Sequence, residues 1–305
     1  MTQLVAERKF DGVIAFKKMP GLDVYFASDP CFEAKFRSNK KWLGRLTRRY
    51  RLYRRWEEAV FAKGQRTQIL LITDREVPLY QEIYGTELER FHLLPPNIDR
   101  RSFSDCDRES ARMAKRKELG LAAEATLLLM VGSGFRTKGV DRAIEGLAPL
   151  NSPGGSQAHL VVVGHGKAES YARLAKSLGV SDRVHFLGGR TDVLEWMLAA
   201  DLLVHPARTE NTGTVLLEAM VSGLPLLVSD VCGYAFHIEK AEAGCLVPSP
   251  FTQERFNRLL QETVHSPNLA QWRANGLRYA ATEDLYSCHE KACGLIEKFI
   301  AEKSR

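Results

Sequence analysis

The chain has 305 residues, of which 45% are hydrophobic and 26% are charged, as in an ordinary soluble globular protein. The length suggests two domains, and the composition excludes intrinsic disorder, collagen and a coiled coil. No apolar run approaches the ~18 residues of a membrane span and the N-terminus has no signal-peptide core, so we expect a cytoplasmic protein. The 6 cysteines form no CxxC pair, which argues against a disulfide scaffold or a zinc ribbon, so we expect reduced, mostly buried thiols.

The first part of the chain, residues 1–105, is predicted to be an incomplete α/β domain. Strand candidates lie at 13–16, 24–27, 68–73 and 91–94, which is few for an independent sheet. A basic helix pair is expected over residues 32–63. The chain opens on residues typical of the end of a helix, followed by Asp11-Gly12 and a strand. We therefore expect the first strands of this domain to be absent.

One short segment makes the whole chain basic. The net charge is +6, yet between Lys35 and Trp56 there are ten basic residues and no acidic one. Apolar side chains recur there at helical spacing, with basic ones on the opposite side. The positions of the apolar face are Trp42, Leu46, Tyr50, Tyr53, Trp56 or Glu57, and Val60, and the basic ones are Lys41, Arg45, Arg48, Arg49, Arg51 and Arg55.

A basic amphipathic helix that carries Trp and Tyr is typical of a protein that binds a membrane surface. The alternatives are a solvated helix face and a nucleic-acid groove. No RNA- or DNA-binding motif accompanies the segment, so we expect an anionic membrane as its partner and no nucleic acid.

The second domain, predicted over residues 106–285, shows a regular alternation. Apolar strands are expected at 126–131, 159–163, 184–187, 202–205, 225–229 and 245–247, with helices at 140–147, 167–178, 192–199, 212–222 and 234–241. Continuous apolar strands between amphipathic helices predict a parallel sheet that is covered on both faces. A last helix is expected within the C-terminal segment 286–305.

The densest motif is Glu210-Asn-Thr-Gly-Thr-Val-Leu-Leu-Glu218, directly after a strand, where open α/β sheets bind ligands. Thr212 can cap the helix that follows, and Thr212, Gly213 and Thr214 leave backbone N–H groups free to hold an anion. Glu210 precedes the helix and Glu218 lies two turns along it, so the pair can hold two groups of one elongated ligand. The alternative is a solvated loop glutamate and an ordinary helix glutamate.

Two other loops follow strands of the same domain. In Gly132-Ser-Gly-Phe-Arg-Thr-Lys138, Gly132 and Gly134 permit close backbone approach, while Arg136 and Lys138 supply the charge that binds phosphate. It is neither a P-loop nor a dinucleotide turn, and the alternative is a glycine turn with solvated bases. The loop Gly188-Gly-Arg190 can meet a nucleobase through its backbone, or it is a capped turn.

The motif from Glu210 to Glu218, together with the sequences KGVDRAI, SGLPLLVS and VCGY, resembles the retaining GT-B glycosyltransferases with two glutamates seven residues apart. The sequences KMPGLDVYFASD, ERFHLLPP, DLLVHPA and DLYS narrow the resemblance to the α-1,3-glucosyltransferases of the lipopolysaccharide core, over almost the whole chain. This family implies two Rossmann-like domains, the first incomplete here, with a C-terminal helix packing back toward it.

The resemblance also implies the reaction: metal-independent, retaining transfer of glucose from UDP-glucose to an inner-core heptose, without a cofactor, at the inner face of the bacterial inner membrane. By this resemblance, Glu210 binds the sugar hydroxyl groups, Glu218 binds the ribose of UDP, and Asp29 faces the sugar. The diphosphate is bound by Lys138 and by the backbone of Thr212, Gly213, Thr214 and Val215. Gly132, Gly134 and Arg136 lie around the diphosphate, and Arg190 lies at the uracil. Donors aimed at the departing diphosphate lower the barrier, each by ~3 kcal/mol.

The chain departs from the family pattern in two places. The family's glycine-rich loop after its first strand has no counterpart before Val13, and Thr137 stands where a basic residue is expected. The alternative function is therefore a UDP-binding, membrane-associated fragment without turnover, and a basic nucleic-acid-associated protein is a third. Asp105-Cys-Asp107 matches the DxD signature of metal-dependent glycosyltransferases, but it lies in a charged linker, so we expect no metal site there.

Overall fold

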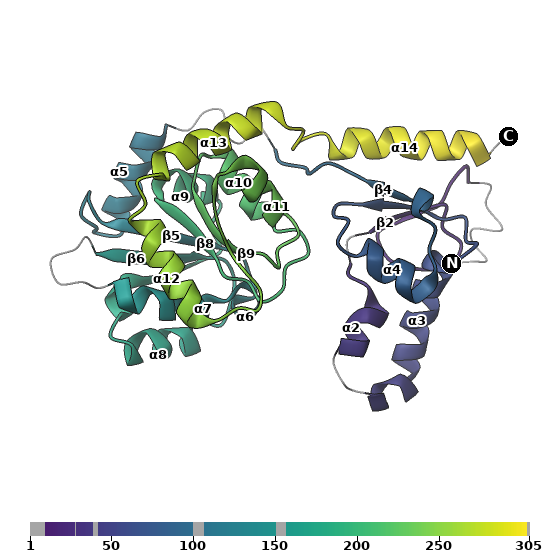
Figure 1. The fold of residues 1–305 in the computed structure, drawn as a ribbon, viewed down its shortest axis with the longest axis horizontal. Helices are drawn as coiled ribbons and strands as arrows, with labels where there is room; N and C mark the ends of the chain where they lie inside the picture. Colours follow the sequence, from purple (N-terminus) through teal and green to yellow (C-terminus); the bar gives the residue numbers. More distant parts are fainter. Residues whose placement is uncertain (1–9, 28, 39–41, 100–106, 151–156, 304–305) are drawn as a thin grey trace. The chain divides into compact units, whose positions relative to one another are not determined.

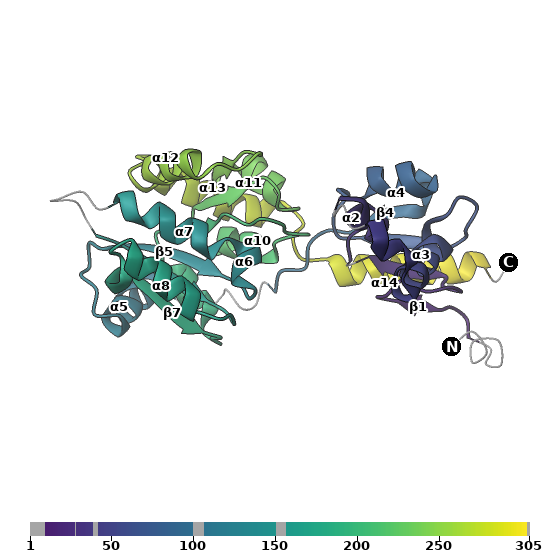
Figure 2. The ribbon, with the colours of Figure 1, turned by 90° about the horizontal axis from the view of Figure 1, so that it is seen from below.

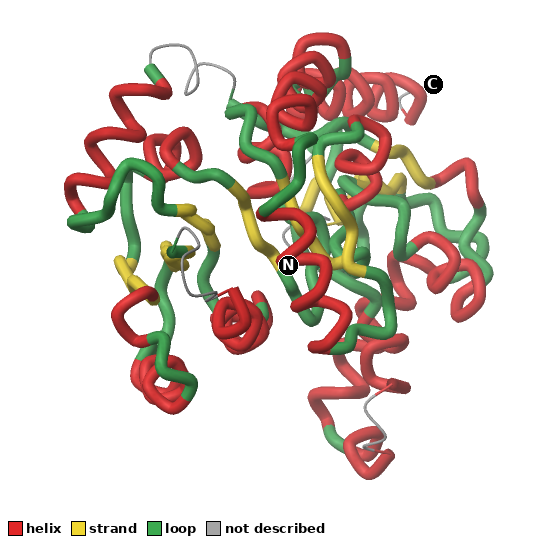
Figure 3. The backbone as a smooth tube through the Cα atoms, turned by 60° about the vertical axis from the view of Figure 1, so that its left-hand side comes forward, coloured by secondary structure: helices red, strands yellow, loops and turns green. Residues whose placement is uncertain are grey.

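The computed structural model describes residues 10–27, 29–38, 42–99, 107–150 and 157–303 (Figure 1). The chain divides into two compact units, residues 1–97 with 286–305 and residues 98–285. The predicted division after residue 105 and the observed one after Asn97 differ by a segment of which 100–106 is outside the described residues. Each unit is built on a parallel sheet, with strands yellow and helices red in Figure 3.

The smaller unit has a sheet in the order β1-β2-β3-β4, in which every neighbouring pair is parallel. Its strands are β1 (Ile14–Ala15), β2 (Val24–Ala27), β3 (Gln68–Leu71) and β4 (Phe91–Leu93). Its helices are α2 (Phe32–Ser38), α3 (Arg48–Phe61), α4 (Val77–Tyr84) and α14 (Cys288–Lys303), with short 3-10 turns η1 (Trp42–Leu46) and η2 (Leu88–Arg90).

Successive strand residues point to opposite faces, and the two faces of this sheet have different cover. Tyr25 and Ile69 pack with Phe61 of α3 and with α4. Val24 and Leu70 face the other way, onto α14. The C-terminal helix therefore packs back onto the first domain, as predicted, and lies beside its strands in both Figure 1 and Figure 2.

The basic helix pair expected over 32–63 is divided into α2, η1 and α3. The side chain of Thr47 caps α3 by accepting a hydrogen bond from the backbone N of Tyr50 at 3.2 Å, which favours a new helix start there. A Cβ at Gly44 would lie 2.8 Å from the ring of Phe36, so η1 approaches α2 closely because this residue has no side chain. Lys41 and the side chain of Trp42 lie outside the described residues.

The larger unit has a six-stranded parallel sheet in the order β10-β9-β8-β5-β6-β7. Its strands are β5 (Thr126–Val131), β6 (Ala158–Val163), β7 (Val184–Gly188), β8 (Leu202–His205), β9 (Leu226–Ser229) and β10 (Gly244–Val247). The helices are α5 (Arg108–Glu118), α6 (Phe135–Lys138), α7 (Val140–Leu147), α8 (Glu169–Ser177), α9 (Val193–Ala199), α10 (Thr214–Val221), α11 (Ala235–Ala241), α12 (Gln253–Val264) and α13 (Leu269–Thr282). The predicted strands and their parallel arrangement are confirmed.

Both faces of this sheet are buried, which explains the continuous apolar strands. Leu128 and Met130 of β5 pack in a core with α7, α8 and α12. Leu127 and Leu129 point to the other face and are fully buried, where α9 packs against the strand. A strand with helices on both sides has no polar face, so its sequence shows no alternation.

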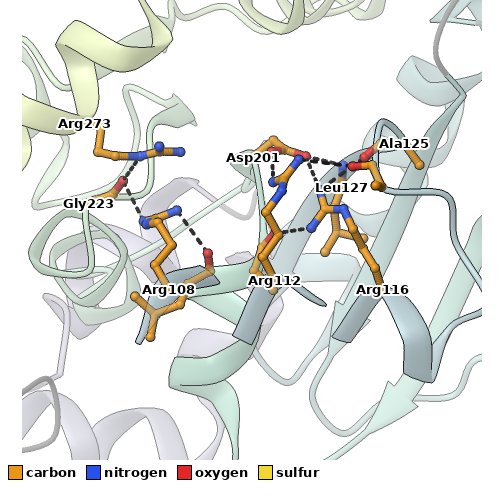
Figure 4. A network of polar contacts seen from close by, with 11 residues as sticks. Arg108, Arg112, Arg116, Ala125, Leu127, Asp201, Gly223 and Arg273 are labelled. Carbon is orange, nitrogen blue, oxygen red and sulfur yellow. Dashed lines mark hydrogen bonds and ion pairs between the residues drawn. The ribbon is translucent and has the colours of Figure 1, made fainter. Parts of the chain in front are cut away.

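Helix α5 is fixed by arginines on one face, because Arg108, Arg112 and Arg116 recur every fourth residue. Arg112 and Arg116 donate to opposite oxygens of Asp201, at 2.5 Å and 2.8 Å. Asp201 also accepts from the backbone N of Leu127 at 2.8 Å. One carboxylate therefore joins α5 to the beginnings of β8 and β5 (Figure 4).

The arginine stripe of α5, formed by Arg108, Arg112 and Arg116, also holds the C-terminus of α10. Arg108 donates to the carbonyl groups of Ser222 and Gly223 at 2.7 Å and 3.0 Å, and Arg273 donates to Gly223 at 3.1 Å (Figure 4). These carbonyl groups lack partners within the helix, and its dipole favours cations there. Helix α10 is thus anchored at the end opposite the one that follows the Glu210 loop.

We expect Asp201→Ala to lower the free energy of unfolding by about 3 kcal/mol, because Arg116 loses its carboxylate while it stays buried. Urea denaturation of the whole chain, followed by far-UV circular dichroism, measures this. Glu239→Ala removes an exposed carboxylate on α11 and should change stability by less than about 0.5 kcal/mol. Equal effects of the two substitutions would contradict the role of Asp201.

Candidate active site

The loops at the carboxyl ends of β5, β6 and β8 pack backbone against backbone. Gly139 has φ +75° and a Cβ there would lie 2.1 Å from the carbonyl oxygen of Pro206. Gly164 has φ +143° and its Cβ would lie 2.4 Å from the carbonyl oxygen of Gly132. Only glycine tolerates both the conformation and the approach. Helix α6 is therefore held directly beside the loop that follows β8.

Three polar side chains from different elements meet at this point. Lys138 ends α6, Glu210 lies in the loop after β8, and His205 is the last residue of β8. The ammonium of Lys138 is paired with Oε2 of Glu210. Nε2 of His205 lies 3.4 Å from the same oxygen. The sequence predicted that Lys138 and Glu210 serve one ligand, and the structure brings them into direct contact.

The pair leaves Glu210 ionised. Burial by itself raises the pKa of this carboxyl group, but the hydrogen bonds from His205 and Lys138 outweigh burial and lower the pKa to about 2. The Lys138 and Glu210 side chains keep 19% and 14% of their surface exposed, so a ligand can reach both. A cation and a fixed carboxylate side by side can hold an anion and a hydroxyl group of one substrate.

Gly132 leaves space for the side chain of Lys138. A Cβ at Gly132 would lie 3.0 Å from Cε of Lys138, so a larger residue would displace the ammonium. Arg136 is exposed, and its carbonyl group accepts a hydrogen bond from Arg208 at 2.9 Å. Gly134 starts α6 in the left-handed conformation, with φ +77°. The phosphate-binding roles given to these residues remain predictions.

The N-terminus of α10 follows Glu210 directly, but its cap differs from the expectation. Gly213, with φ +86°, is the N-cap, and the predicted capping by the Thr212 side chain is wrong. The left-handed glycine turns the chain into the helix without a side-chain cap, and the Thr212 carbonyl accepts from Tyr234 N at 2.8 Å. The amide groups of Thr214 and Val215 lie in the first turn, where helix N–H groups have no intrahelical partner.

Glu218 lies further along α10 and is half-buried. Burial raises the pKa of its carboxyl group. Within the part of the chain that the structure describes, its carboxylate accepts no hydrogen bond. A partly desolvated carboxylate without a partner is a candidate for binding ligand hydroxyl groups.

The remaining predicted residues lie in other surroundings. The Arg190 guanidinium is paired with Asp192 at 2.7 Å and with Glu118 at 3.1 Å, so its side chain belongs to an ion-pair cluster between α5 and α9. Asp29, in the smaller unit, is exposed after β2. Their proposed contacts with uracil and sugar remain predictions. Of the DxD sequence, Asp107 caps α5 by accepting from Ser110 N at 2.8 Å, and Asp105 is outside the described residues.

Sequence reasoning missed His205. The available signal was a histidine at the end of an otherwise apolar strand, five positions before Glu210. Its side chain is fully buried, and its Nδ1 has no hydrogen-bond partner among the described residues.

The sequence matches the family Glycosyl transferases group 1 over residues 111–278, more than half of the chain. It is 46% identical to the lipopolysaccharide glucosyltransferase WaaG of Escherichia coli (strain K12), covering 95% of this chain and 78% of that protein. It is 30% identical to the D-inositol 3-phosphate glycosyltransferase of Jonesia denitrificans, covering 60% of this chain and 46% of that protein. The chain therefore spans about half the length of that second relative.

Solved structures agree with these matches. A crystal structure of WaaG, a glycosyltransferase involved in lipopolysaccharide biosynthesis, has TM-score 0.87 and 44% identity, covering 97% of this chain and 80% of that chain. Anabaena HepE in complex with UDP-glucose has TM-score 0.72 at 19% identity, covering 90% of this chain and 72% of that chain; this likeness concerns the fold alone. The predicted GT-B fold and the resemblance to lipopolysaccharide core glucosyltransferases are confirmed.

Replacement of Lys138 by Met should make stability less dependent on acid pH. The pKa of Glu210 in the folded chain, about 2, lies below the ~4.3 of an unfolded glutamate. The stabilisation is therefore present above about pH 4.3 and is lost as pH falls through about 2. Lys138→Met raises the folded pKa, so wild type should exceed the variant by roughly 1–2 kcal/mol at pH 7, less at pH 3.

Urea denaturation of both proteins between pH 3 and pH 7 gives this difference. Lys240→Met is the matched control, because Lys240 pairs with Glu283 at 3.0 Å on the surface, where ion pairs contribute little. A gap between wild type and Lys138→Met that stays constant down to pH 3 would exclude the ion pair as its source.

Proposed function

We propose that this chain, which belongs to the group 1 glycosyltransferase family, transfers glucose from UDP-glucose to a heptose of the lipopolysaccharide inner core. The transfer retains the anomeric configuration and uses no metal ion. The 46% identity to the lipopolysaccharide glucosyltransferase WaaG supports the choice of substrates. The single observation that carries the proposal is the contact between Lys138 and Glu210 beside the first turn of α10.

Breaking the bond between glucose and UDP places negative charge on the departing diphosphate. The ammonium of Lys138 and the amide groups of Thr214 and Val215 are donors already in place for that charge, and preorganised donors stabilise a transition state strongly. Because a lysine and a helix N-terminus supply the positive charge, the reaction requires no bound cation in this proposal.

The two glutamates would bind different hydroxyl groups. Oε2 of Glu210 is engaged by Lys138 and His205, which leaves Oε1 for a hydroxyl group of the glucose. Glu218, whose carboxylate has no partner among the described residues, would accept from the ribose of UDP. Arg190 would contact uracil through its backbone, since its side chain is engaged with Asp192 and Glu118.

A basic surface on α2, η1 and α3 would hold the chain on the membrane that contains the acceptor. Leu46, Leu52 and Tyr53 are exposed there by 72%, 45% and 41%. The same elements carry these exposed basic side chains: Lys35, Arg37, Arg45, Arg48, Arg49, Arg51, Arg54 and Arg55. Each basic residue near an anionic bilayer contributes ~1 kcal/mol, and the apolar side chains add burial in the interface. The proposed location is the inner face of the bacterial inner membrane.

The exposed apolar residues partly correct the expected helix face. Tyr50 and Val60 are buried in the smaller unit, but Leu46 and Tyr53, assigned to the same face, are exposed. None of the described helices is both long enough and apolar enough to cross a bilayer. Attachment would therefore depend on this surface.

Exchange of each glutamate separates sugar binding from nucleotide binding. Glu210→Gln should lower transfer at least 100-fold, while the Kd for UDP changes less than threefold, because its carboxylate is assigned to the glucose. Glu218→Gln should weaken UDP binding at least tenfold. Isothermal titration with UDP and a transfer assay with radiolabelled UDP-glucose and heptose-terminated core lipid measure both.

The same assay tests the alternative. If the unmodified chain binds UDP and vesicles but does not transfer glucose, it is a nucleotide-binding, membrane-associated fragment without turnover. Transfer that survives in Glu210→Gln, or that requires added Mg²⁺, contradicts the mechanism proposed here.

Reversal of three charges tests the membrane surface. Arg48→Glu, Arg51→Glu and Arg55→Glu together should reduce binding to phosphatidylglycerol vesicles at least tenfold, with UDP affinity unchanged. Sedimentation with vesicles at low and high salt measures this. The same number of charges reversed at Arg173, Lys176 and Arg258, exposed residues of the larger unit, is the control. Equal losses in both variants, or salt-dependent DNA binding without vesicle binding, would contradict the assignment.

A further inference from the structure

His205 has no role in the proposed reaction so far, yet it is the one histidine beside the Lys138–Glu210 pair among the described residues. It ends β8 after Leu202, Leu203 and Val204, which are buried like the histidine itself. We propose that His205 is a positioning residue: its imidazole donates to Oε2 of Glu210 and so directs the free oxygen of this carboxylate at the donor sugar. The inference rests on the function proposed above.

The surroundings of the imidazole decide which nitrogen donates to Glu210. Nε2 lies 3.4 Å from a carboxylate oxygen, which can only accept, so Nε2 carries the proton. Nδ1 is buried and has no partner in the described part of the chain. The contacts therefore make Nε2 the nitrogen that donates to Glu210.

A second donor on Oε2 has a specific advantage at this place. Lys138 already supplies one positive charge to Oε2, and the same lysine is assigned to the diphosphate. When the ammonium turns toward a bound diphosphate, the hydrogen bond from His205 remains on Oε2. The carboxylate then keeps its orientation and its charge, and Oε1, which has no partner among the described residues, stays directed away from the imidazole.

Packing alone does not explain a histidine here. The neighbouring β8 residues are leucine and valine, and burying an imidazole with one unpartnered nitrogen is less favourable than burying another aliphatic side chain. An aliphatic residue would fill the end of the strand without an unpaired polar atom. Residues that oppose local preference in this way are expected at functional sites.

The contact is tested without substrate by a double-mutant cycle. His205→Leu, Glu210→Ala and the double variant are unfolded in urea at pH 7, since alanine removes the acceptor that a glutamine would keep. We expect non-additive effects, with a coupling of at least threefold in the unfolding equilibrium constant. His159→Leu replaces another buried histidine, on β6, and should be additive with Glu210→Ala. Additivity for His205 as well would overturn the inference, whether or not the chain transfers glucose.

The consequence is tested by binding and turnover. His205→Leu should leave the Kd for UDP within twofold of wild type, but should remove the additional affinity for UDP-glucose and lower kcat at least tenfold. In a plot of kcat against pH, the acid limb of His205→Leu should move to higher pH than that of wild type, because the ionised carboxylate of Glu210 loses a hydrogen bond. His205→Gln keeps an N–H donor at the same reach and should recover most of the loss.

Three results would overturn the inference. These are equal impairment of His205→Gln and His205→Leu, a parallel loss of UDP affinity, and an unchanged pH profile; each is the result expected from a packing defect. If the wild-type chain itself shows no preference for UDP-glucose over UDP, the proposed function fails, and the double-mutant cycle still decides whether His205 holds Glu210.

Discussion

The ion pair between Lys138 and Glu210 is the interaction on which the candidate site depends. It joins two loops that are 72 positions apart in the chain, and it forms only because the loop after β5 contacts the loop after β8. Gly139 allows that contact, since any Cβ would overlap the carbonyl group of Pro206. Arg208 strengthens it from outside, because its guanidinium pairs with Asp141 at 2.6 Å. The ion pair thus depends on the backbone contact between the two loops.

Helix α10 connects the site with the frame of the larger unit. Its N-terminus follows Glu210, and its C-terminal carbonyl groups are held by Arg108 and Arg273. A helix is stiff over two turns, so fixing one end limits movement at the other. Arginines suit this task because a guanidinium donates to several acceptors in a fixed plane. The arginine stripe of α5 therefore contributes to the placement of amide groups that it does not touch.

The sheet, its direction and the Lys138–Glu210 neighbourhood could be predicted from the sequence, because strands buried on both faces leave continuous apolar runs and parallel strands end at one edge. Local sequence patterns gave wrong or incomplete predictions for residues whose conformation or partners are set by tertiary contacts. Thr212 is a good N-cap by type, but the chain enters α10 through the left-handed Gly213. Arg190 is a suitable base-binding residue by type, but Asp192 and Glu118 occupy its guanidinium. His205 gave little signal, because its partner is fixed only by the fold.

The smaller unit shows how a protein can carry a dense row of arginines. Like charges along one helix repel and destabilise it, so α3 depends on its buried side. There the carboxylate of Glu57 is completely buried; it accepts from Lys18 at 2.5 Å and from the backbone N of Phe32 at 2.8 Å, at the start of α2. Tyr84 of α4 donates to it at 2.8 Å. One acid thus joins three helices internally, while the exposed side of α3 carries arginines but no neighbouring acid before Glu57. The helix itself does not neutralise the positive charge of these arginines. That charge therefore remains available to an external anionic surface.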